Sequence, residues 1–183
     1  MPIIIGERII LREYRQADLK EIREWVNDPE VVANLSDIFL YPHTLTQTEN
    51  WLTTQLEGKG NEGFVIAHKD SQEYIGQIDF VSIDWRNRVG EIGIVIGAAK
   101  NRGQGFGSEA IRLLQQFAFA TLNLNKIELK VHDYNERAFH CYQKCGFREE
   151  GRLRERFFRQ GRYTDYIQMG ILKREYEEGK GLN

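Results

Sequence analysis

The sequence predicts a single domain of the α/β (α+β) class, with helices on both faces of a mixed, mostly antiparallel, twisted sheet of about seven strands. Three observations predict it. Short β-branched or alternating runs recur at strand length, segments with helical apolar spacing separate them, and the resulting order is β-α-α-β-β-β-α-β-α-β-β. This order is typical of a mixed sheet with helices on both faces. At 183 residues, the chain is predicted to form one domain, residues 1–183.

The N-terminal part is predicted to contain one strand, two helices and then three strands. The first helix, residues 17–27, has one apolar face and ends before Pro29. Residues 30–45 have little periodicity and are expected to be a loop or an irregular helical turn. Thr46 and Glu49 form the pattern of a capping box, which indicates the start of the second helix. That helix is expected over residues 46–57, and the strands over residues 8–12, 64–68, 74–83 and 92–96.

The C-terminal part is predicted to contain two helices, a strand and a final hairpin. Apolar positions at helical spacing between Ala110 and Thr121 indicate the first helix. The tail from Lys173 is polar and is expected to fray. The remaining elements are a strand at residues 126–131, a helix at residues 135–144, and a hairpin of residues 148–158 and 163–172.

Composition places the chain among ordinary globular proteins, with 41% hydrophobic and 28% charged residues. No run of 18 apolar residues occurs, so no transmembrane helix is expected. The first residues lack a basic segment and a small-residue cleavage site, which argues against a signal peptide and favours a cytoplasmic protein.

The two cysteines, Cys141 and Cys145, are four residues apart on one predicted helix, where burial is expected rather than a disulfide. His132 and His140 do not complete a known ligand pattern with them, so no metal site is expected. Basic residues are not interleaved with aromatic ones in a stripe except in residues 148–162, which alternate like strands, so direct nucleic-acid binding is disfavoured.

Charge is distributed unequally along the chain. Residues 1–96 hold 16 acidic and 9 basic side chains, and residues 97–183 hold 11 acidic and 16 basic ones. This division suits a protein with an anionic cofactor on one side and a cationic amine on the other, although surface charges also differ between halves by chance.

A glycine-rich segment follows the apolar run Ile92–Ile96 and precedes a predicted helix. Its residues are Arg102, Gly103, Gln104, Gly105, Phe106, Gly107 and Ser108. A strand, a glycine loop and a helix together point free backbone N–H groups and the positive end of the helix dipole at an anion. Glycines let the backbone approach a diphosphate closely. We interpret the segment as a pyrophosphate-binding loop, although a plain turn before a helix has the same composition.

The spacing of this loop distinguishes between nucleotide classes. A dinucleotide fold requires G-x-G-x-x-G and a P-loop requires Gly-Lys-Ser/Thr, and neither occurs here. The pattern Arg-x-x-Gly-x-Gly, at Arg102, Gly105 and Gly107, resembles the pyrophosphate loop of the GNAT superfamily of acyl-CoA N-acyltransferases. A second segment, NERAFHCYQKCGF, is similar to that superfamily at Asn135, Ala138, Tyr142, Gly146 and Phe147.

The resemblance implies a GNAT fold in which the fourth and fifth strands splay apart. The gap would admit the pantetheine arm of acetyl-CoA, the cosubstrate, beside Ile94, Val95 and Ile96, with Asn135 as a further contact. The loop residues 102–108 would hold its diphosphate.

The resemblance also places Tyr142 where the general acid of the family stands. A thiol titrates near about 8.5, so the departing thiolate needs only modest help from a proton donor. The base is open between Glu91, at the start of the fourth strand, and Asp79 on the third strand. Either carboxylate acts directly, through water, or by attracting the cationic amine.

The acceptor is predicted to be a primary amine. Residues 27–31, together with the helix of Trp51, resemble N-terminal acetyltransferases of ribosomal proteins, so a protein N-terminus is the first reading. Residues 119–176 are also similar to spermidine N-acetyltransferases, which makes a polyamine the alternative; amino sugars, antibiotics and a non-catalytic acyl-CoA-binding module remain further alternatives. Candidate acceptor-binding carboxylates are Asp28, Glu30, Asp37, Asp79 and Asp84. A homodimer is a further expectation, and no membrane partner is expected.

Overall fold

The computed structural model describes residues 3–180, and contacts divide the chain into two compact units. The first unit consists of residues up to Val81 together with Gly93–Leu113, and the second of Ser82–Ile92 together with residues from Leu114 onward. We describe each unit by itself, and the single-domain organisation stays a prediction.

Four antiparallel strands form the sheet of the first unit. β2 (Ile9–Arg12) pairs with β3 (Gly63–His68), and β3 pairs with β4 (Tyr74–Asp84), as the sequence predicts to within a residue or two. A short additional strand, β1 (Ile4–Ile5), pairs with β2 and was not expected.

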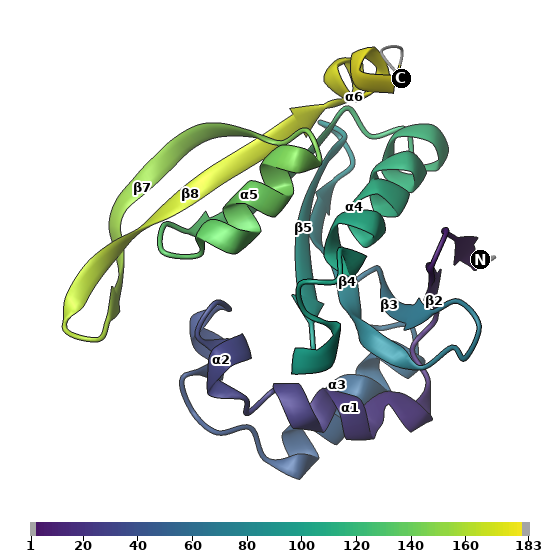
Figure 1. The fold of residues 1–183 in the computed structure, drawn as a ribbon, viewed down its shortest axis with the longest axis vertical. Coiled ribbons are helices and arrows are strands. Elements are labelled where there is room, and N and C mark those ends of the chain that lie inside the picture. The colour runs from purple at the N-terminus through teal and green to yellow at the C-terminus, as the bar shows by residue number, and fades with distance from the viewer. Residues whose placement is uncertain (1–2, 181–183) are drawn as a thin grey trace. The chain divides into compact units, whose positions relative to one another are not determined.

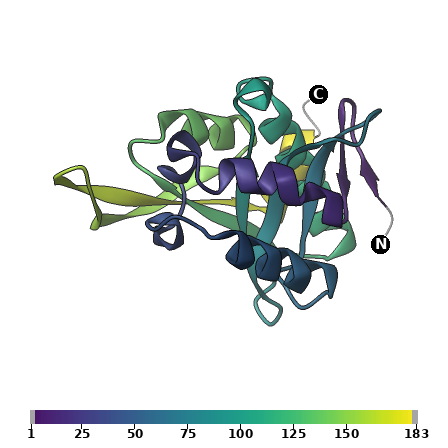
Figure 2. The same ribbon diagram turned by 90° about the horizontal axis from the view of Figure 1, so that it is seen from below.

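Helices of the first unit cover one face of this sheet (Figure 2). Ile22 and Trp25 of α1 and Leu52 of α3 pack with Val65 and Tyr74 in one core, because each helix has one apolar face. The helical elements are η1 (Gln16–Asp18), α1 (Leu19–Trp25), α2 (Pro29–Val32), η2 (Asp37–Phe39) and α3 (Leu45–Leu56).

Two boundaries in this unit differ from the prediction. Pro29 was predicted only as the residue after which the first helix cannot continue, but it is also the first residue of α2. At the start of that helix, the Asp28 side chain accepts a hydrogen bond from Glu30 N. The capping box at the start of α3 is formed by Thr44 and Gln47, two residues before the predicted pair, because Thr44 has the extended backbone that a capping residue requires.

The strand β5 (Val89–Ile96) belongs partly to each unit. Its first residues pair in parallel with β6 (Lys126–His132), from Val89 opposite Lys126 to Glu91 opposite Glu128. The splayed gap beside Ile94–Ile96 stays a prediction. The helical turn η3 (Ala99–Asn101) and the helix α4 (Phe106–Gln116) follow, and the helix continues as a π-helical turn, Phe117–Thr121.

The second unit contains a long hairpin and two more helices (Figure 1). β8 (Arg162–Leu172) pairs antiparallel with both β6 and β7 (Arg148–Arg159), and α5 (Glu136–Lys144) lies beside this sheet. The tail does not fray at Lys173 as predicted. Lys173–Lys180 forms α6, whose Glu175 accepts a hydrogen bond from Leu172 N and pairs with Arg148.

The eight described strands follow the order β1-β2-β3-β4-β5-β6-β8-β7, which confirms the predicted mixed, mostly antiparallel sheet with one more strand than expected. Cys141 and Cys145 form no disulfide within residues 3–180, and Cys145 is buried. Between residues 3 and 180, no group of three or more potential metal ligands occurs, and no helix has both the length and the apolarity that a membrane crossing needs.

Candidate active site

The glycine loop lies between η3 and α4 in the first unit, and its conformation depends on glycine. Gly103 has φ 77° and Gly105 has φ 84°, values in the left-handed region that favours residues without a Cβ. Gly103, Gln104 and Gly105 are all exposed. Because α4 begins at Phe106, the N–H groups of its first turn lie at the positive end of its dipole. The loop therefore has the form of an anion-binding site.

Arg8 braces this loop, a role that the sequence did not reveal. Its Nη1 donates to Gln104 O at 2.8 Å, and its guanidinium stacks over the Phe106 ring at 4.9 Å. Glu109 of α4 accepts from Arg8 Nε at 3.0 Å and from Arg8 N at 2.8 Å. Arg8 thus contacts the middle of the loop and the first turn of α4.

Two buried donors beside the loop lack an acceptor within residues 3–180. They are Nδ2 of Asn101, whose side chain is almost fully buried, and Nε of Arg102. An unpaired buried donor is costly, so the pair indicates a site completed by a ligand with oxygen acceptors. The exposed glycine backbone beside them fits an anionic group such as a diphosphate.

The predicted pantetheine strand adjoins the loop. Ile94, Val95 and Ile96 are half-buried, and the start of α4 packs close to them at Gly107, where an added Cβ would lie 3.8 Å from the Ile96 side chain. Ser108 is in the first turn of α4. The structure therefore brings together all the predicted cofactor residues of the first unit.

Arg102 is also joined to two predicted acceptor residues. Its Nη2 lies 3.1 Å from Asp28 Oδ2 and its Nη1 lies 3.2 Å from Glu30 Oε2. These carboxylates are therefore already balanced by a cation of the cofactor loop, which the sequence pattern did not indicate.

In the second unit, Tyr142 lies in the last turn of α5. It is half-buried, and its ring meets Phe147 edge to face at 6.1 Å between centroids. Burial raises the pKa of Tyr142 well above that of a free phenol, with smaller contributions from Cys141 and Tyr166. The phenol therefore keeps its proton throughout the neutral range.

Glu91 and Asn135 also lie in the second unit, and both have partners. Glu91 Oε1 pairs with Lys130 Nζ at 2.8 Å. The Asn135 side-chain oxygen accepts from Ala138 N at 3.2 Å and caps α5, so its amide NH₂ is the group that remains for a ligand.

Asp79 has a different environment. Its half-buried carboxylate accepts hydrogen bonds from Tyr14 OH at 2.5 Å and from Gln77 Nε2 at 3.3 Å. Burial raises the pKa of Asp79 to about 7, against the lowering effect of both hydrogen bonds.

The other two predicted acceptor carboxylates are exposed. Asp37 begins η2. Asp84 accepts hydrogen bonds from the backbone and side-chain nitrogens of Asn87 in the turn after β4, and the backbone bond lowers its pKa.

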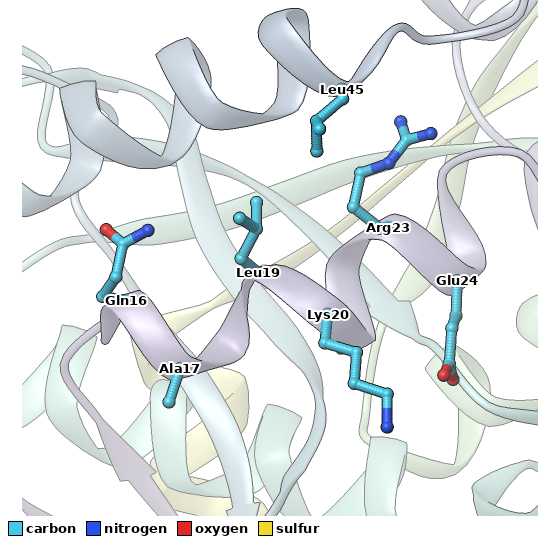
Figure 3. A pocket seen from close by; sticks show the side chains of 7 residues that line it. All are labelled: Gln16, Ala17, Leu19, Lys20, Arg23, Glu24 and Leu45. Carbon is cyan, nitrogen blue, oxygen red and sulfur yellow. The ribbon is translucent and has the colours of Figure 1, made fainter.

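A shallow hollow of about 560 Å³ between α1 and the start of α3 contains none of the predicted site residues (Figure 3). Arg23, at its edge, donates to His43 O and Thr48 Oγ1 and so joins the two helices. The hollow is lined by Gln16, Ala17, Leu19, Lys20, Arg23, Glu24 and Leu45.

The segment that contains the loop and the Tyr142 helix matches the model of a known family. The acetyltransferase (GNAT) domain matches residues 8–148 of this chain. The chain belongs to the GNAT acetyltransferase family. As a GNAT member it is an acetyl-CoA-dependent amine N-acetyltransferase, which confirms the predicted reaction class and cosubstrate.

Full-length relatives share its sequence and fold. An uncharacterized N-acetyltransferase p20 of Bacillus licheniformis is 34% identical, covering 96% of this chain and 99% of the relative. The spermidine N(1)-acetyltransferase of Vibrio cholerae is 32% identical, covering 94% and 97%. A crystal structure of spermidine N-acetyltransferase from Vibrio cholerae in complex with CoA and spermine superimposes with a TM-score of 0.81 at 31% identity, covering 93% and 98%.

Proposed function

We propose that this GNAT enzyme transfers an acetyl group from acetyl-CoA to a primary amine of spermidine or a similar linear polyamine. The observation that carries the proposal is the similarity over nearly the full length to a spermidine N(1)-acetyltransferase, and to a structure of such an enzyme with CoA and spermine. The sequence predicted a protein N-terminus as the first choice of acceptor, and these relatives support the polyamine alternative instead.

The cofactor residues are proposed to position the acyl group. Acetyl-CoA supplies a thioester carbonyl that a neutral amine attacks. The N–H groups at the start of α4, with Asn101 and Arg102, bind the anionic end of the carrier, and the edge of Ile94–Ile96 binds its arm. Asn135 donates its amide N–H to the same arm.

Tyr142 is proposed to protonate the departing thiolate. The buried phenol is always protonated near neutral pH, and it regains a proton from the amine nitrogen as the new N–C bond forms. No net proton remains on the enzyme from this exchange.

Thiol release from acetyl-CoA tests the proposal. We expect turnover with spermidine and spermine that exceeds turnover with peptides bearing free N-terminal alanine or serine by at least about 10²-fold in kcat/KM. A preference for the peptides would overturn the polyamine assignment. Tight acetyl-CoA binding without turnover of any amine would favour a non-catalytic binding module.

A further inference from the structure

Asp79 ends a chain of hydrogen bonds between buried side chains of the first unit. Trp25 Nε1 donates to Tyr74 OH at 3.0 Å, and Tyr74 OH donates to Gln77 Oε1 at 3.2 Å. Gln77 and Tyr14 then donate to the two oxygens of Asp79. All four partners are at least nine-tenths buried, whereas Asp79 is only half-buried. Asp79 is therefore the least covered residue of this hydrogen-bonded network.

The strands around Asp79 also leave space for it. Its register partner on β3 is Gly63, and a Cβ at that position would collide with Asp79 Oδ1. On the Tyr14 side, the phenol is held by an edge-on contact with Trp51, 5.5 Å between centroids. The position of the carboxylate is thus fixed by contacts from β3, β4 and the segment after β2.

No ion pair involving Asp79 occurs within the described residues 3–180. Arg12 and Asp18 act on the same network, but they form a buried pair with each other at 2.7 Å. Burial raises the pKa of both Tyr14 and Tyr74, so these phenols stay protonated and serve as donors. Within this hydrogen-bonded network, Asp79 is the side chain whose pKa lies near 7. Among residues 3–180, no Lys, Arg or His forms an ion pair with it.

We propose that Asp79 binds the reacting ammonium of the acceptor and takes its proton before acetyl transfer, with Tyr14 and Gln77 as its positioning residues. The proposal rests on the assignment of a cationic amine acceptor. It adds a catalytic role for a carboxylate of β4 that the relatives' names do not give.

The proton balance of the step is as follows. The alkylammonium gives one proton to the Asp79 carboxylate and becomes a neutral amine. The amine forms the N–C bond as the C–S bond breaks; the thiolate takes a proton from Tyr142, and Tyr142 recovers one from the amine nitrogen. Asp79 returns its proton to water, so one proton is released per acetyl group transferred. The ammonium of an alkylamine has a pKa of about 10.4. A carboxylate with a pKa of about 7 accepts a proton from it roughly 10³-fold more favourably than a carboxylate with an ordinary pKa does.

Asp79→Asn is the first test. We expect kcat/KM for spermidine at pH 8 to fall roughly 10²- to 10³-fold, because the amide can neither pair with the ammonium nor accept its proton. The Kd for CoA, measured by calorimetry, should stay within about 2-fold of the parent value. Glu57→Gln, the same chemical change at an exposed carboxylate paired with Lys59, should leave both quantities unchanged.

Tyr14→Phe distinguishes catalysis from structure. The hydrogen bond from Tyr14 lowers the pKa of Asp79, so its removal raises that pKa. The base acts only when ionised, and kcat/KM therefore rises with pH through a limb near 7. In Tyr14→Phe this limb should move to higher pH, while the plateau above it changes less. Tyr41→Phe, which removes an exposed phenol, should not move the limb.

Two outcomes would overturn the inference. One is a Tyr14→Phe profile in which the limb of kcat/KM stays at the same pH and kcat/KM falls by the same factor at every pH. That result would indicate a purely structural role for Tyr14. The other is an Asp79→Asn enzyme with full activity. If the parent enzyme does not turn over polyamines but acetylates another amine, the proposed function fails, and the same pH profiles measured with that amine still decide the role of Asp79.

Discussion

The glycine loop and the Asp79 carboxylate lie in the same unit, and the two proposed sites would present charge to a ligand by different means. The loop uses main-chain N–H groups in a glycine conformation within a few consecutive residues. Asp79 uses one side chain whose properties depend on Tyr14, 65 positions earlier in the sequence. The first kind of site is therefore readable from a local pattern, and the second becomes visible only when the strands are assembled.

Gly105→Val should produce the largest effect on the loop. A β-branched side chain at φ 84° is strained, and its Cβ would lie 3.2 Å from Arg8 Nη2, where the loop is braced. We expect loss of measurable CoA binding by calorimetry, at least about 10³-fold in Kd. Gly58→Val is the matched control, because Gly58 has φ 67° at the end of α3 with open space around it. Normal CoA affinity in Gly105→Val would contradict the anion-binding loop.

Tyr142→Phe should act on chemistry and not on the loop. We expect kcat to fall about 10²-fold, with the Kd for CoA unchanged, because the ring and its contact with Phe147 remain and only the proton donor is lost. Pre-steady-state thiol release measures the chemical step directly. An unchanged rate would remove Tyr142 from the mechanism.

Sequence patterns predicted the loop, the helix that follows it and the Tyr142 helix, because each depends on residues close together in the chain. They also predicted the order of helices and strands along the chain and most element boundaries. They misplaced the capping box of α3, since two threonines two residues apart both fit the pattern and only the backbone of Thr44 is extended. They missed α6, where Glu175 contacts Leu172 N and Arg148 and the Tyr176 ring packs against Phe119.

The candidate carboxylates show where sequence reasoning stops. Asp28 and Glu30 were grouped with Asp79 as acceptor residues, but the structure pairs the first two with Arg102 and leaves Asp79 without a cation among the described residues. Charge type is visible in a sequence, whereas the partner that neutralises it depends on tertiary contacts. The bracing role of Arg8 was missed for the same reason, since Glu109 is 101 positions away.

Arg8→Ala should have a smaller effect on the loop than the glycine substitution. It removes the donor to Gln104 O and the stacking on Phe106, but it leaves the glycine backbone and the helix dipole in place. We expect the Kd for CoA to rise roughly 3- to 10-fold, as for the loss of one partly exposed charged hydrogen bond. Arg8→Lys should recover little of the affinity, because an ammonium lacks the planar fork that contacts Gln104 and Glu109 together. An unchanged Kd in Arg8→Ala would show that the loop holds its form without this brace.

Glu91→Gln should produce the smallest effect, and it tests the choice between the two carboxylates. Glu91 already has a cation, Lys130, at 2.8 Å, and both side chains are partly exposed, so the pair contributes about 0–1 kcal/mol. If Asp79 is the proton acceptor, kcat/KM in Glu91→Gln falls by no more than about 3-fold, and its pH limb stays near 7. Lys130→Met, which frees the Glu91 carboxylate, should leave the limb in place as well. A fall of 10² or more in Glu91→Gln, together with loss of the limb, would transfer the base role to Glu91, and the Tyr14→Phe profile would then remain unshifted.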